Sequence, residues 1–364
     1  MNVPESKAIR KILGPAAFIY GIGASLKMQL YDQKIFTPAK LPVPVISIGN
    51  ITVGGTGKTP ITIDLANRLT EQGKKVGILS RGYKRKSSAD QVVVSDGKQI
   101  LASCEDAGDE PYLMALSCKN AVVISGASRV DTGKTAIESY GCDILLLDDG
   151  FQHVKLDRER NIVLIDYADS LDEEAVLPAG RLREPLAGLK RATEIIITKV
   201  PEQADELHLG KLRKAVTGSL EETNSGPPEF FYSRFKPSLL RNTYEELSLE
   251  SLAGARVISL SGIARPESFH GMVRDLGFQI VAKLTYEDHH WFDQNDRDKL
   301  EKSLEENEAA FVLTTEKDLV RLNLKEALAR RTFAIVLSTE WIGRMPEFSG
   351  LDNPGEIKAE TKNA

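Results

Sequence analysis

The sequence contains little cysteine, no excess of positive charge and no long hydrophobic run. Its 364 residues include 3 cysteines, and none of them forms a C-x-x-C pair. Such scattered cysteines predict neither a disulfide framework nor a thiolate zinc site, and they favour a reducing compartment. The net charge is −5 at pH 7, whereas a protein that neutralises nucleic-acid phosphates normally carries a basic excess. We therefore expect no nucleic-acid partner.

The uncharged stretch of the amino-terminal segment, residues 12–26, is too short to cross a bilayer as a helix, because a span needs roughly twenty residues. Arg10 and Lys11 precede this stretch, so a cleaved signal peptide is an alternative interpretation. The nucleotide chemistry described below requires intracellular nucleotide and argues against cleavage.

Residues 1–40 are nevertheless basic, with six lysines or arginines against two acidic residues. At helical spacing, one face collects bulky residues and a second stripe collects small ones: Ile12, Ile19, Ile22 and Leu26, then Gly14, Ala17, Gly21 and Ala24. A bulky apolar face flanked by cations such as Arg10 and Lys11 is typical of a helix that lies on an anionic membrane surface. The alternative is a core helix that packs through its small residues.

The remaining composition, with 41% hydrophobic and 27% charged residues, is that of an ordinary globular protein. Short apolar runs between residues 41 and 217 predict buried parallel strands joined by helical crossovers: 43–49, 76–80, 121–125, 143–148, 161–166 and 194–199. We predict a doubly wound, mainly parallel α/β sheet of the P-loop NTPase type, preceded by the amphipathic helix.

A second, smaller α/β domain is predicted for residues 238–345. Its expected strands are 257–261, 280–284, 310–314 and 333–338. Residues 218–237 are rich in Gly, Pro and Ser at their start and predict an extended linker. Residues 346–364 predict a mobile tail.

The segment GNITVGGTGKTP, residues 49–60, predicts a phosphate-binding loop between a strand and a helix. Glycines let backbone N–H groups face an anion, and the helix dipole adds to the attraction. Lys58 would reach the β and γ phosphates, and the Thr59 hydroxyl would bind Mg²⁺. Because Thr52 replaces the first glycine of the strict pattern, this is a variant loop; the alternative is a chance GKT in a glycine-rich turn. The predicted nucleotide-binding residues are Thr52, Val53, Gly54, Gly55, Thr56, Gly57, Lys58 and Thr59.

Asp148 and Asp149 end an apolar run that predicts a buried strand. At the carboxyl end of that strand, a carboxylate beside the phosphate loop can hold Mg²⁺ directly or through water. Alternatively, the two carboxylates cap the turn that follows. The sequence Thr198-Lys199-Val200-Pro201 lacks the aspartate of a guanine-reading motif, which favours ATP over GTP. A phosphate loop alone does not distinguish a kinase from an ATPase switch with a protein partner.

Six short motifs then occur in a defined order: TVGGTGKTP at 52–60, LSRGYKR at 79–85, GDEP at 108–111, LLLDDGFQH at 145–153, GRLREP at 180–185 and EDHHWF at 287–292. In these motifs the sequence resembles the tetraacyldisaccharide 4′-kinase family, from the basic amino-terminal segment to about residue 320. The resemblance implies transfer of the ATP γ-phosphoryl group to the 4′-hydroxyl of an acylated glucosamine disaccharide 1-phosphate, a lipid A precursor. It implies a place on the cytoplasmic face of the bacterial inner membrane, with the lipid and the anionic surface as partners. We infer no obligate protein partner.

The resemblance also strengthens Asp109 as the base for the sugar hydroxyl, although a carboxylate at a helix start is the simpler interpretation of this residue alone. His289 would orient that base, which implies a site formed between two domains. His290 is adjacent and could be confused with it.

Arg181 and Arg183 could stabilise charge on the transferring phosphoryl group, with Glu110 and Glu184 in the metal shell. Arg81, Lys84 and Arg85 follow a strand end, where they could meet the 1-phosphate or lipid headgroups. A solvated charge cluster and a basic loop are the respective alternatives. The predicted catalytic residues are thus Asp109, His289, Lys58 and Arg181.

Overall fold

The computed structural model describes residues 7–33, 35–220, 226–348 and 351, and its strands form one continuous sheet. The strands of the amino-terminal half are β1 (Val45–Asn50), β2 (Val76–Ser80), β3 (Gln91–Asp96), β4 (Val122–Gly126), β5 (Ile144–Asp148), β6 (Arg160–Asp166) and β7 (Glu194–Thr198). They follow the order β7-β6-β1-β5-β2-β4-β3, and every pair is parallel except β3 with β4. The predicted mainly parallel sheet is confirmed, and β3 is an antiparallel edge strand that the sequence did not indicate.

Helices cover both faces of this half. They are α1 (Lys7–Asp32), α2 (Lys58–Glu71), α3 (Cys104–Ala107), α4 (Asp109–Ser117), α5 (Arg129–Glu138) and α6 (Glu206–Gly218), with short 3-10 turns η1 (Leu171–Glu173) and η2 (Leu186–Arg191). Alternate side chains of β1 point to opposite faces, as strand geometry requires: Ile46 packs with Ile61 and Leu65 of α2, whereas Val45 packs with Ala136 of α5. The sheet is therefore doubly wound.

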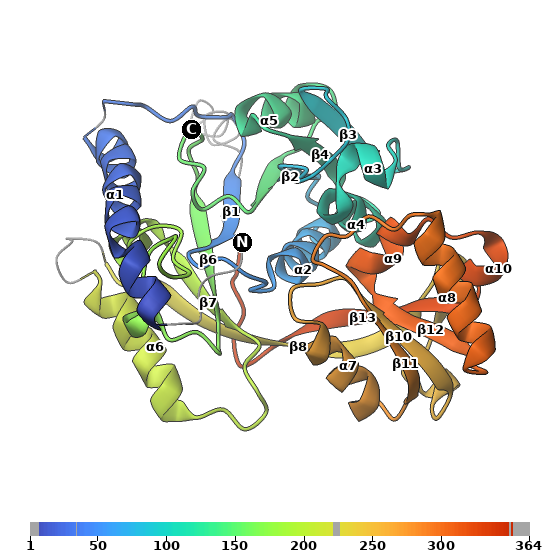
Figure 1. Cartoon of the computed structure of the whole chain (residues 1–364). Helices are drawn as coiled ribbons and strands as arrows, with labels where there is room; N and C mark the ends of the chain where they lie inside the picture. Colours follow the sequence, from blue (N-terminus) through green and yellow to red (C-terminus); the bar gives the residue numbers. More distant parts are fainter. Residues whose placement is uncertain (1–6, 34, 221–225, 349–350, 352–364) are drawn as a thin grey trace.

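The carboxyl-terminal half is smaller and lies beside the first (Figure 1). It contains β8 (Glu229–Arg241), β9 (Glu246–Leu247), β10 (Arg256–Ser261), β11 (Gln279–Thr285), β12 (Phe311–Thr315) and β13 (Thr332–Trp341), with η3 (Leu249–Leu252), α7 (Pro266–Asp275), α8 (Gln294–Glu306), α9 (Glu316–Leu322) and α10 (Glu326–Ala329). The pairs β10–β11, β10–β12 and β12–β13 are parallel. Each predicted strand of this region corresponds to an observed one.

Strand β8 joins the two halves. Its first residues pair with β7 in parallel, and residues 233–241 pair with β13 in antiparallel. The segment predicted as a linker, 218–237, thus differs from a free connection: residues 229–237 lie in the sheet, whereas 221–225 are outside the described residues. The alternation of Phe231, Ser233 and Phe235 accounts for the strand, because Phe231 and Ser233 are both buried. The proposed division into domains stays a prediction.

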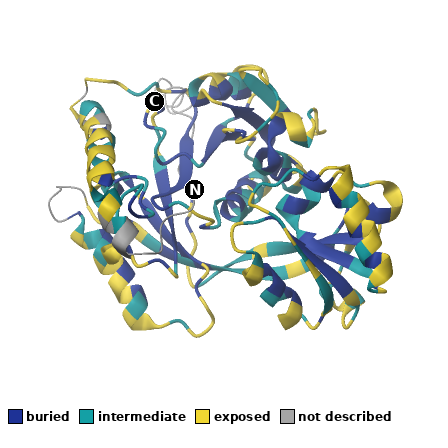
Figure 2. Ribbon diagram, viewed as in Figure 1, coloured by how far each residue is buried: buried dark blue, intermediate teal, exposed yellow. Residues whose placement is uncertain are grey.

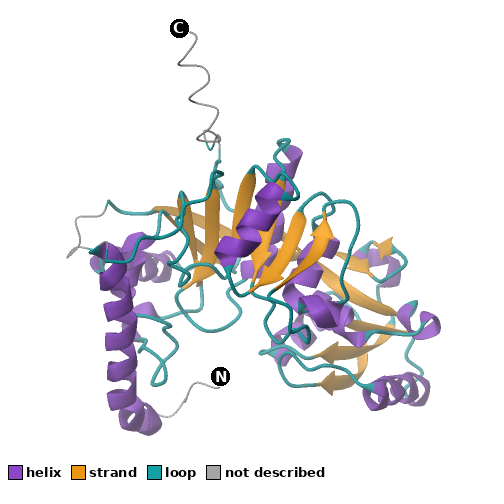
Figure 3. Ribbon diagram, turned by 90° about the horizontal axis from the view of Figure 1, so that it is seen from above, coloured by secondary structure: helices purple, strands orange, loops and turns teal. Residues whose placement is uncertain are grey.

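Helix α1 stands at the edge of the molecule, on the side away from the carboxyl-terminal half (Figures 1 and 3). Its bulky residues remain exposed, with Ile12 at 76% and Ile19 at 71%, while Ala17 of the small stripe is buried. In Figure 2 this helix is mostly yellow, in contrast to the dark blue central strands. Of the small stripe only Ala17 is buried, and a Cβ added at Gly14 or Gly21 would meet none of the described atoms within 4 Å. Both the core-helix and the membrane-surface interpretations stay predictions.

Two further points concern the ends of the chain. Within the described residues, none of the helices combines the length and the hydrophobicity that crossing a bilayer requires. Phe348, inside the predicted tail 346–364, is buried and packs in the core with Ile46 and Ile48. That part of the tail differs from the prediction, because an aromatic side chain gains free energy by leaving water. Residues 349–350 and 352–364 lie outside the described residues.

Candidate active site

The predicted phosphate loop connects β1 to α2 and is held from several sides. Gly54 and Gly57 have φ values of 126° and 86°, a backbone region that favours glycine. The Asn50 side chain donates to Thr56 Oγ1 at 3.1 Å, and Thr198 Oγ1 donates to the Thr56 carbonyl at 2.8 Å. These hydrogen bonds hold the loop to β1 and β7.

The strand that joins the two halves also requires glycine at position 57. A Cβ at this position would lie 2.4 Å from the ring of Phe235, on β8. No side chain fits there unless Phe235 moves. The phosphate loop thus packs directly on the connection between the halves.

Arg181 braces the loop from outside. Its Nη2 donates to the Val53 carbonyl at 3.1 Å, and its Nη1 contacts Asp169 at 2.6 Å. Thr52 donates to the same Asp169 carboxylate at 3.2 Å, so threonine at this position has a structural partner that glycine would lack. With these contacts, Arg181 positions the loop in this structure, and its catalytic role stays a prediction.

Arg183 and Lys58, the predicted phosphate-binding lysine, share the carboxylate of Asp149 as a partner. Both oxygens of Asp149 accept from Arg183 Nη1 at 2.9 Å, and Lys58 Nζ lies 3.6 Å from Asp149. Burial alone would raise the pKa of Asp149, but the two cations lower it. Asp149 adopts a φ of 51°, a strained value for a residue with a side chain. This strained residue is the one whose carboxylate contacts the cations of both Arg183 and Lys58.

Asp148 is the carboxylate whose environment favours a bound cation most clearly. It is buried at the end of β5, and Ser80 donates to its Oδ2 at 3.0 Å, whereas Oδ1 has no partner among the described residues. Burial, with Glu110 and Asp149 nearby, raises the pKa of Asp148 to about 7. A buried carboxylate with an unsatisfied oxygen and acidic neighbours fits Mg²⁺, which prefers oxygen ligands.

The other two predicted metal carboxylates have protein cations as partners. Glu110 forms an ion pair with Lys317, and this lysine lowers the pKa of Glu110 against the effect of burial. Both oxygens of Glu184 accept from Arg191, at 2.9 and 2.8 Å. Metal binding by these two carboxylates stays a prediction that requires an exchange of partners.

Asp109 and His289 meet across the two halves. His289 Nδ1 lies 2.8 Å from Asp109 Oδ2, although 180 positions separate them in sequence. Asp109, at the start of α4, is only 3% exposed, and its Oδ1 accepts from the Glu110 backbone N–H at 2.9 Å. Burial raises the pKa of Asp109, but the hydrogen bond from His289 and nearby cations outweigh it and lower the pKa. His289 has a φ of 61°. His290 instead contacts Asp296 at 2.7 Å.

The basic loop after β2 lies next to this pair. The Tyr83 ring makes an edge contact with the His289 ring, with centroids 5.5 Å apart. Arg81 and Lys84 are exposed, whereas Arg85 donates to the Ser125 carbonyl at 3.0 Å and so holds the loop. Two of the three predicted substrate cations are thus accessible to an anion in solution.

At the other predicted anion-facing site, Arg10 lies 3.6 Å from Glu174. This contact anchors the start of α1 to the protein. The side chain of Lys11 lies outside the described residues.

Sequence reasoning missed two cations on α9. Lys317 pairs with Glu110, and Arg321 lies 3.7 Å from Asp109. The signal that could have identified them is the charged run Glu-Lys-Asp directly after the predicted strand that ends at Thr314. Like Asp148, this charged run lies at the carboxyl end of a strand.

A phosphate loop on a doubly wound sheet, a strand-end carboxylate suited to a metal and an Asp–His pair beside them define a P-loop phosphotransferase. The comparisons with known proteins specify which one. Residues 9–348 match the family model described as "Tetraacyldisaccharide-1-P 4'-kinase". The chain therefore belongs to the tetraacyldisaccharide 4′-kinase family, whose members are kinases.

Individual relatives agree with this assignment. A tetraacyldisaccharide 4′-kinase from Anaeromyxobacter sp. (strain Fw109-5) is 40% identical over 91% of this chain and 88% of its own length. The corresponding enzyme from Syntrophus aciditrophicus is 38% identical, over 86% and 84%. A crystal structure of LpxK from Aquifex aeolicus in complex with ATP superposes with a TM-score of 0.72 at 30% identity, covering 98% of this chain and 99% of that one.

Proposed function

We propose that this protein transfers the γ-phosphoryl group of ATP to the 4′-hydroxyl of a tetraacylated glucosamine disaccharide 1-phosphate, which yields the bisphosphorylated lipid A precursor. The observation that carries the proposal is the Asp109–His289 pair, assembled from both halves beside the phosphate loop. Glu110, next to Asp109, interacts electrostatically with Lys58 and with Asp148. The proton acceptor and the nucleotide site therefore share one region.

The reaction needs one proton acceptor and one oriented phosphoryl group. The 4′-hydroxyl oxygen attacks the γ-phosphorus, its proton passes to the Asp109–His289 pair, and the bond to the β-phosphate oxygen breaks with its electrons on ADP. Lys58 and the backbone N–H groups of residues 54–59 neutralise the phosphate oxygens. Arg183 and Asp149 hold Lys58 in place, which is the positioning that phosphoryl transfer requires.

Mg²⁺ bound with ATP would supply further neutralisation of the β and γ oxygens. Thr59 and Asp148 are the residues that we propose to hold it, since both are buried at the phosphate loop and Asp148 Oδ1 has no partner in the described chain. The remaining predicted ligands are Asp149, Glu110 and Glu184. Each forms an ion pair with a lysine or arginine, which the metal would have to displace.

We further propose that the enzyme works on the anionic cytoplasmic surface of the inner membrane. The support is the bulky exposed face of α1, because apolar side chains at a helix surface gain free energy by entering the bilayer interface.

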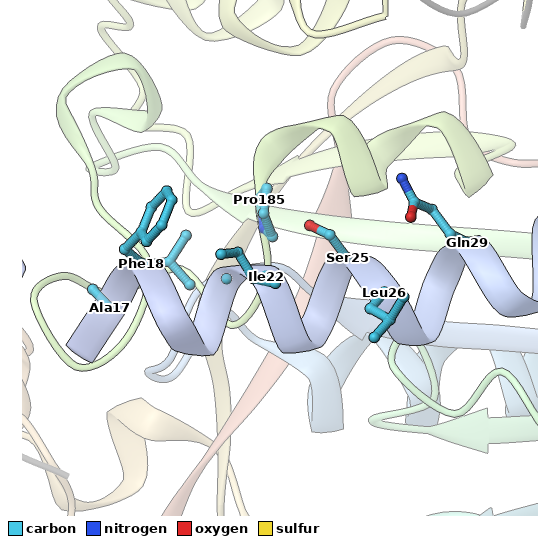
Figure 4. Close-up of a pocket in the computed structure, with 9 residues that line it drawn as sticks. Ala17, Phe18, Ile22, Ser25, Leu26, Gln29 and Pro185 are labelled. Carbon is cyan, nitrogen blue, oxygen red and sulfur yellow. The ribbon is translucent and has the colours of Figure 1, made fainter. Parts of the chain in front are cut away.

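An open groove of about 570 Å³ runs between α1 and Val176 and Pro185. Figure 4 shows Phe18, Ile22 and Leu26 along it. The exposed Arg81 and Lys84 are suited to the 1-phosphate.

The experiment that tests the proposed reaction is a transfer assay with γ-labelled ATP, Mg²⁺ and the tetraacylated disaccharide 1-phosphate in mixed micelles. We expect labelled bisphosphorylated lipid from the wild-type chain and loss of at least about 100-fold in rate for Lys58→Ala. Lys98→Ala, on an exposed turn, is the matched control and should leave the rate unchanged. A folded wild-type protein that binds ATP but labels no lipid would refute the proposal.

A further inference from the structure

The short helix α9 faces the catalytic carboxylates with two cations one turn apart. Lys317 and Arg321 are separated by four residues, so they lie on the same face of the helix. Lys317 reaches Glu110, and Arg321 reaches Asp109. The Arg321 side chain is 1% exposed, which is unusual for a guanidinium group because burying a charge is costly unless it is paired.

Arg321 has several partners at once. Its Nη2 donates to Asp318 Oδ1 at 2.5 Å and to the Gly262 carbonyl at 3.1 Å. Its Nε donates to the Lys317 carbonyl at 3.0 Å and lies 3.7 Å from Asp109 Oδ2. Nη1 has no partner in the part of the chain that the structure describes.

Two of these partners also hold His289. Asp109 Oδ2, which Arg321 approaches, is the oxygen that contacts His289 Nδ1 at 2.8 Å. The Gly262 carbonyl, which accepts from Arg321, also accepts from the His289 backbone N–H at 3.3 Å. One buried guanidinium group therefore contacts the atoms that fix the ring and the backbone of His289.

We propose that Arg321 is a positioning residue that sets the geometry of the Asp109–His289 pair. This inference rests on the proposed function, in which that pair accepts the hydroxyl proton. A guanidinium group is planar and presents several N–H donors in a rigid arrangement, so it can hold several acceptors at once in fixed positions.

The surroundings of Arg321 are built to keep it in place. Asp318 accepts from the Gly262 backbone N–H at 3.0 Å and from Thr315 Oγ1 at 2.6 Å. A Cβ at Gly262 would lie 2.9 Å from Asp318 Oδ1, so this residue must be small for the carboxylate to approach. The strained backbone of His289 requires such support, because a positive φ persists only where neighbours over-determine it.

Charged and titratable groups from several elements face Asp109. Those that face Asp109 are His289 from the loop after β11, Lys317 and Arg321 from α9, Cys104 from α3 and Glu110 from α4. Burial raises the pKa of Cys104 to about 12, so this thiol stays neutral near pH 7. Loss of Arg321 would leave Lys317 as the remaining fixed cation of this group, and Lys317 is already paired with Glu110.

The test compares Arg321→Met with Arg330→Met, a matched change at an exposed arginine of the same half. We expect Arg321→Met to lower kcat about 100-fold with little change in the KM for ATP, because misplacement by about 1 Å can cost that much. Arg330→Met should leave both kcat and the KM for ATP unchanged.

The conservative variant separates charge from geometry. Arg321→Lys keeps the cation but cannot reach Gly262, Asp318 and Asp109 together, so we expect a lowered kcat with little change in the KM for ATP. A folded Arg321→Met with a kcat within threefold of wild type would overturn the proposal. If Arg321→Met does not fold, Arg321→Lys decides, and an unchanged kcat there would overturn it.

A second readout keeps this inference distinct from the proposed function. If the wild-type chain forms no lipid product, the proposed function fails, and Arg321 is then examined through the ring ¹⁵N signals of His289 in the ATP-bound protein at one fixed pH. We expect these signals to change in Arg321→Met and to stay as in wild type in Arg330→Met. Identical signals in all three proteins would show that Arg321 does not position His289.

Discussion

The two halves of the molecule contribute to the site in different ways. The amino-terminal half holds its groups at strand ends and in the phosphate loop, where parallel-sheet geometry gathers them: Asp148 follows β5 and Lys58 begins α2. The carboxyl-terminal half contributes cations and one histidine from a loop and from α9, namely His289, Lys317 and Arg321. In the proposed mechanism, nucleotide binding is therefore local to one half, whereas the proton acceptor requires both.

This difference predicts that damage to the contact between the halves should spare ATP binding and abolish transfer. The connecting strand β8 is the exception, because Phe235 packs on the phosphate loop at Gly57. Changes there should affect both functions. Variants that separate the two functions are therefore the most informative ones.

Asp109→Asn should have the largest effect. The amide retains the shape of the side chain but cannot accept the proton or stabilise charge on His289, so we expect kcat to fall by about 10²–10⁴-fold. ATP affinity, measured by calorimetry, should change less than about threefold. Asp106→Asn, at an exposed carboxylate of α3, is the control. Parallel losses of kcat and ATP affinity would contradict the division of roles between the halves.

Asp148→Asn should affect the amino-terminal half alone and should change stability with pH. Because the pKa of Asp148 is raised to about 7 from 3.8, its contribution to stability is present below pH 4 and is lost as the pH rises through 7. The ligand-free variant should therefore unfold at a higher temperature than wild type at pH 8, with a gain in unfolding free energy of at most about 4 kcal/mol. The two proteins should differ little at pH 4.

The same variant should lose its response to the nucleotide. Mg²⁺ and ATP should raise the melting temperature of wild type and raise that of Asp148→Asn much less. Asp298→Asn, an exposed carboxylate of α8, serves as the control. A variant less stable than wild type at pH 8, with full stabilisation by Mg²⁺ and ATP, would exclude the proposed metal site.

Gly57→Ala should lower both the stability of the protein and its affinity for ATP by a moderate amount. The positive φ and the contact with Phe235 together should cost about 1–3 kcal/mol of unfolding free energy, and ATP affinity should fall. Gly73→Ala is a close control, because Gly73 has a φ of 85° and a Cβ added there would meet none of the described atoms within 4 Å. Equal destabilisation by the two substitutions in chemical denaturation would show that the Phe235 contact is unimportant.

The smallest effect on catalysis should come from α1. Phe18→Glu with Ile19→Glu places two charges on its exposed face and should reduce binding to anionic vesicles by at least about tenfold. ATP binding should be unchanged. Leu207→Glu, at an apolar residue of α6 that is 78% exposed, is the control and should bind as wild type does. Unchanged sedimentation of the double variant with vesicles would sink the proposed membrane contact.

Sequence patterns predicted well what depends on neighbours along the chain. The apolar runs located every predicted strand to within a few residues, and the phosphate loop and Asp148 followed from their positions at strand ends. The edge strand β3 was missed because its sequence, QVVVSD, has only three apolar residues between polar ones and is only partly buried at the edge of the sheet. The pairing of β8 with both halves depends on the partner strands, which local periodicity does not specify.

In the site, too, the contacts between residues far apart in sequence could not be predicted from local patterns. Asp109 and His289 were connected only through a family resemblance, since 180 positions separate them. Arg321 and Lys317 occupy a helix whose charges look solvated until α4 is placed against it. Of the two arginines of GRLREP, Arg183 rather than Arg181 contacts the partner of Lys58, because the backbone turns Arg181 toward Val53.

In the proposed mechanism, a histidine of the carboxyl-terminal half completes the catalytic site of the amino-terminal half. Comparing kcat for His289→Gln and His290→Gln in the lipid assay tests it most directly, because the two residues are adjacent and, of the two, His289 contacts Asp109 whereas His290 contacts Asp296. We predict a loss of at least about 100-fold for His289→Gln and a kcat near that of wild type for His290→Gln. Equal activity of the two variants would contradict the account.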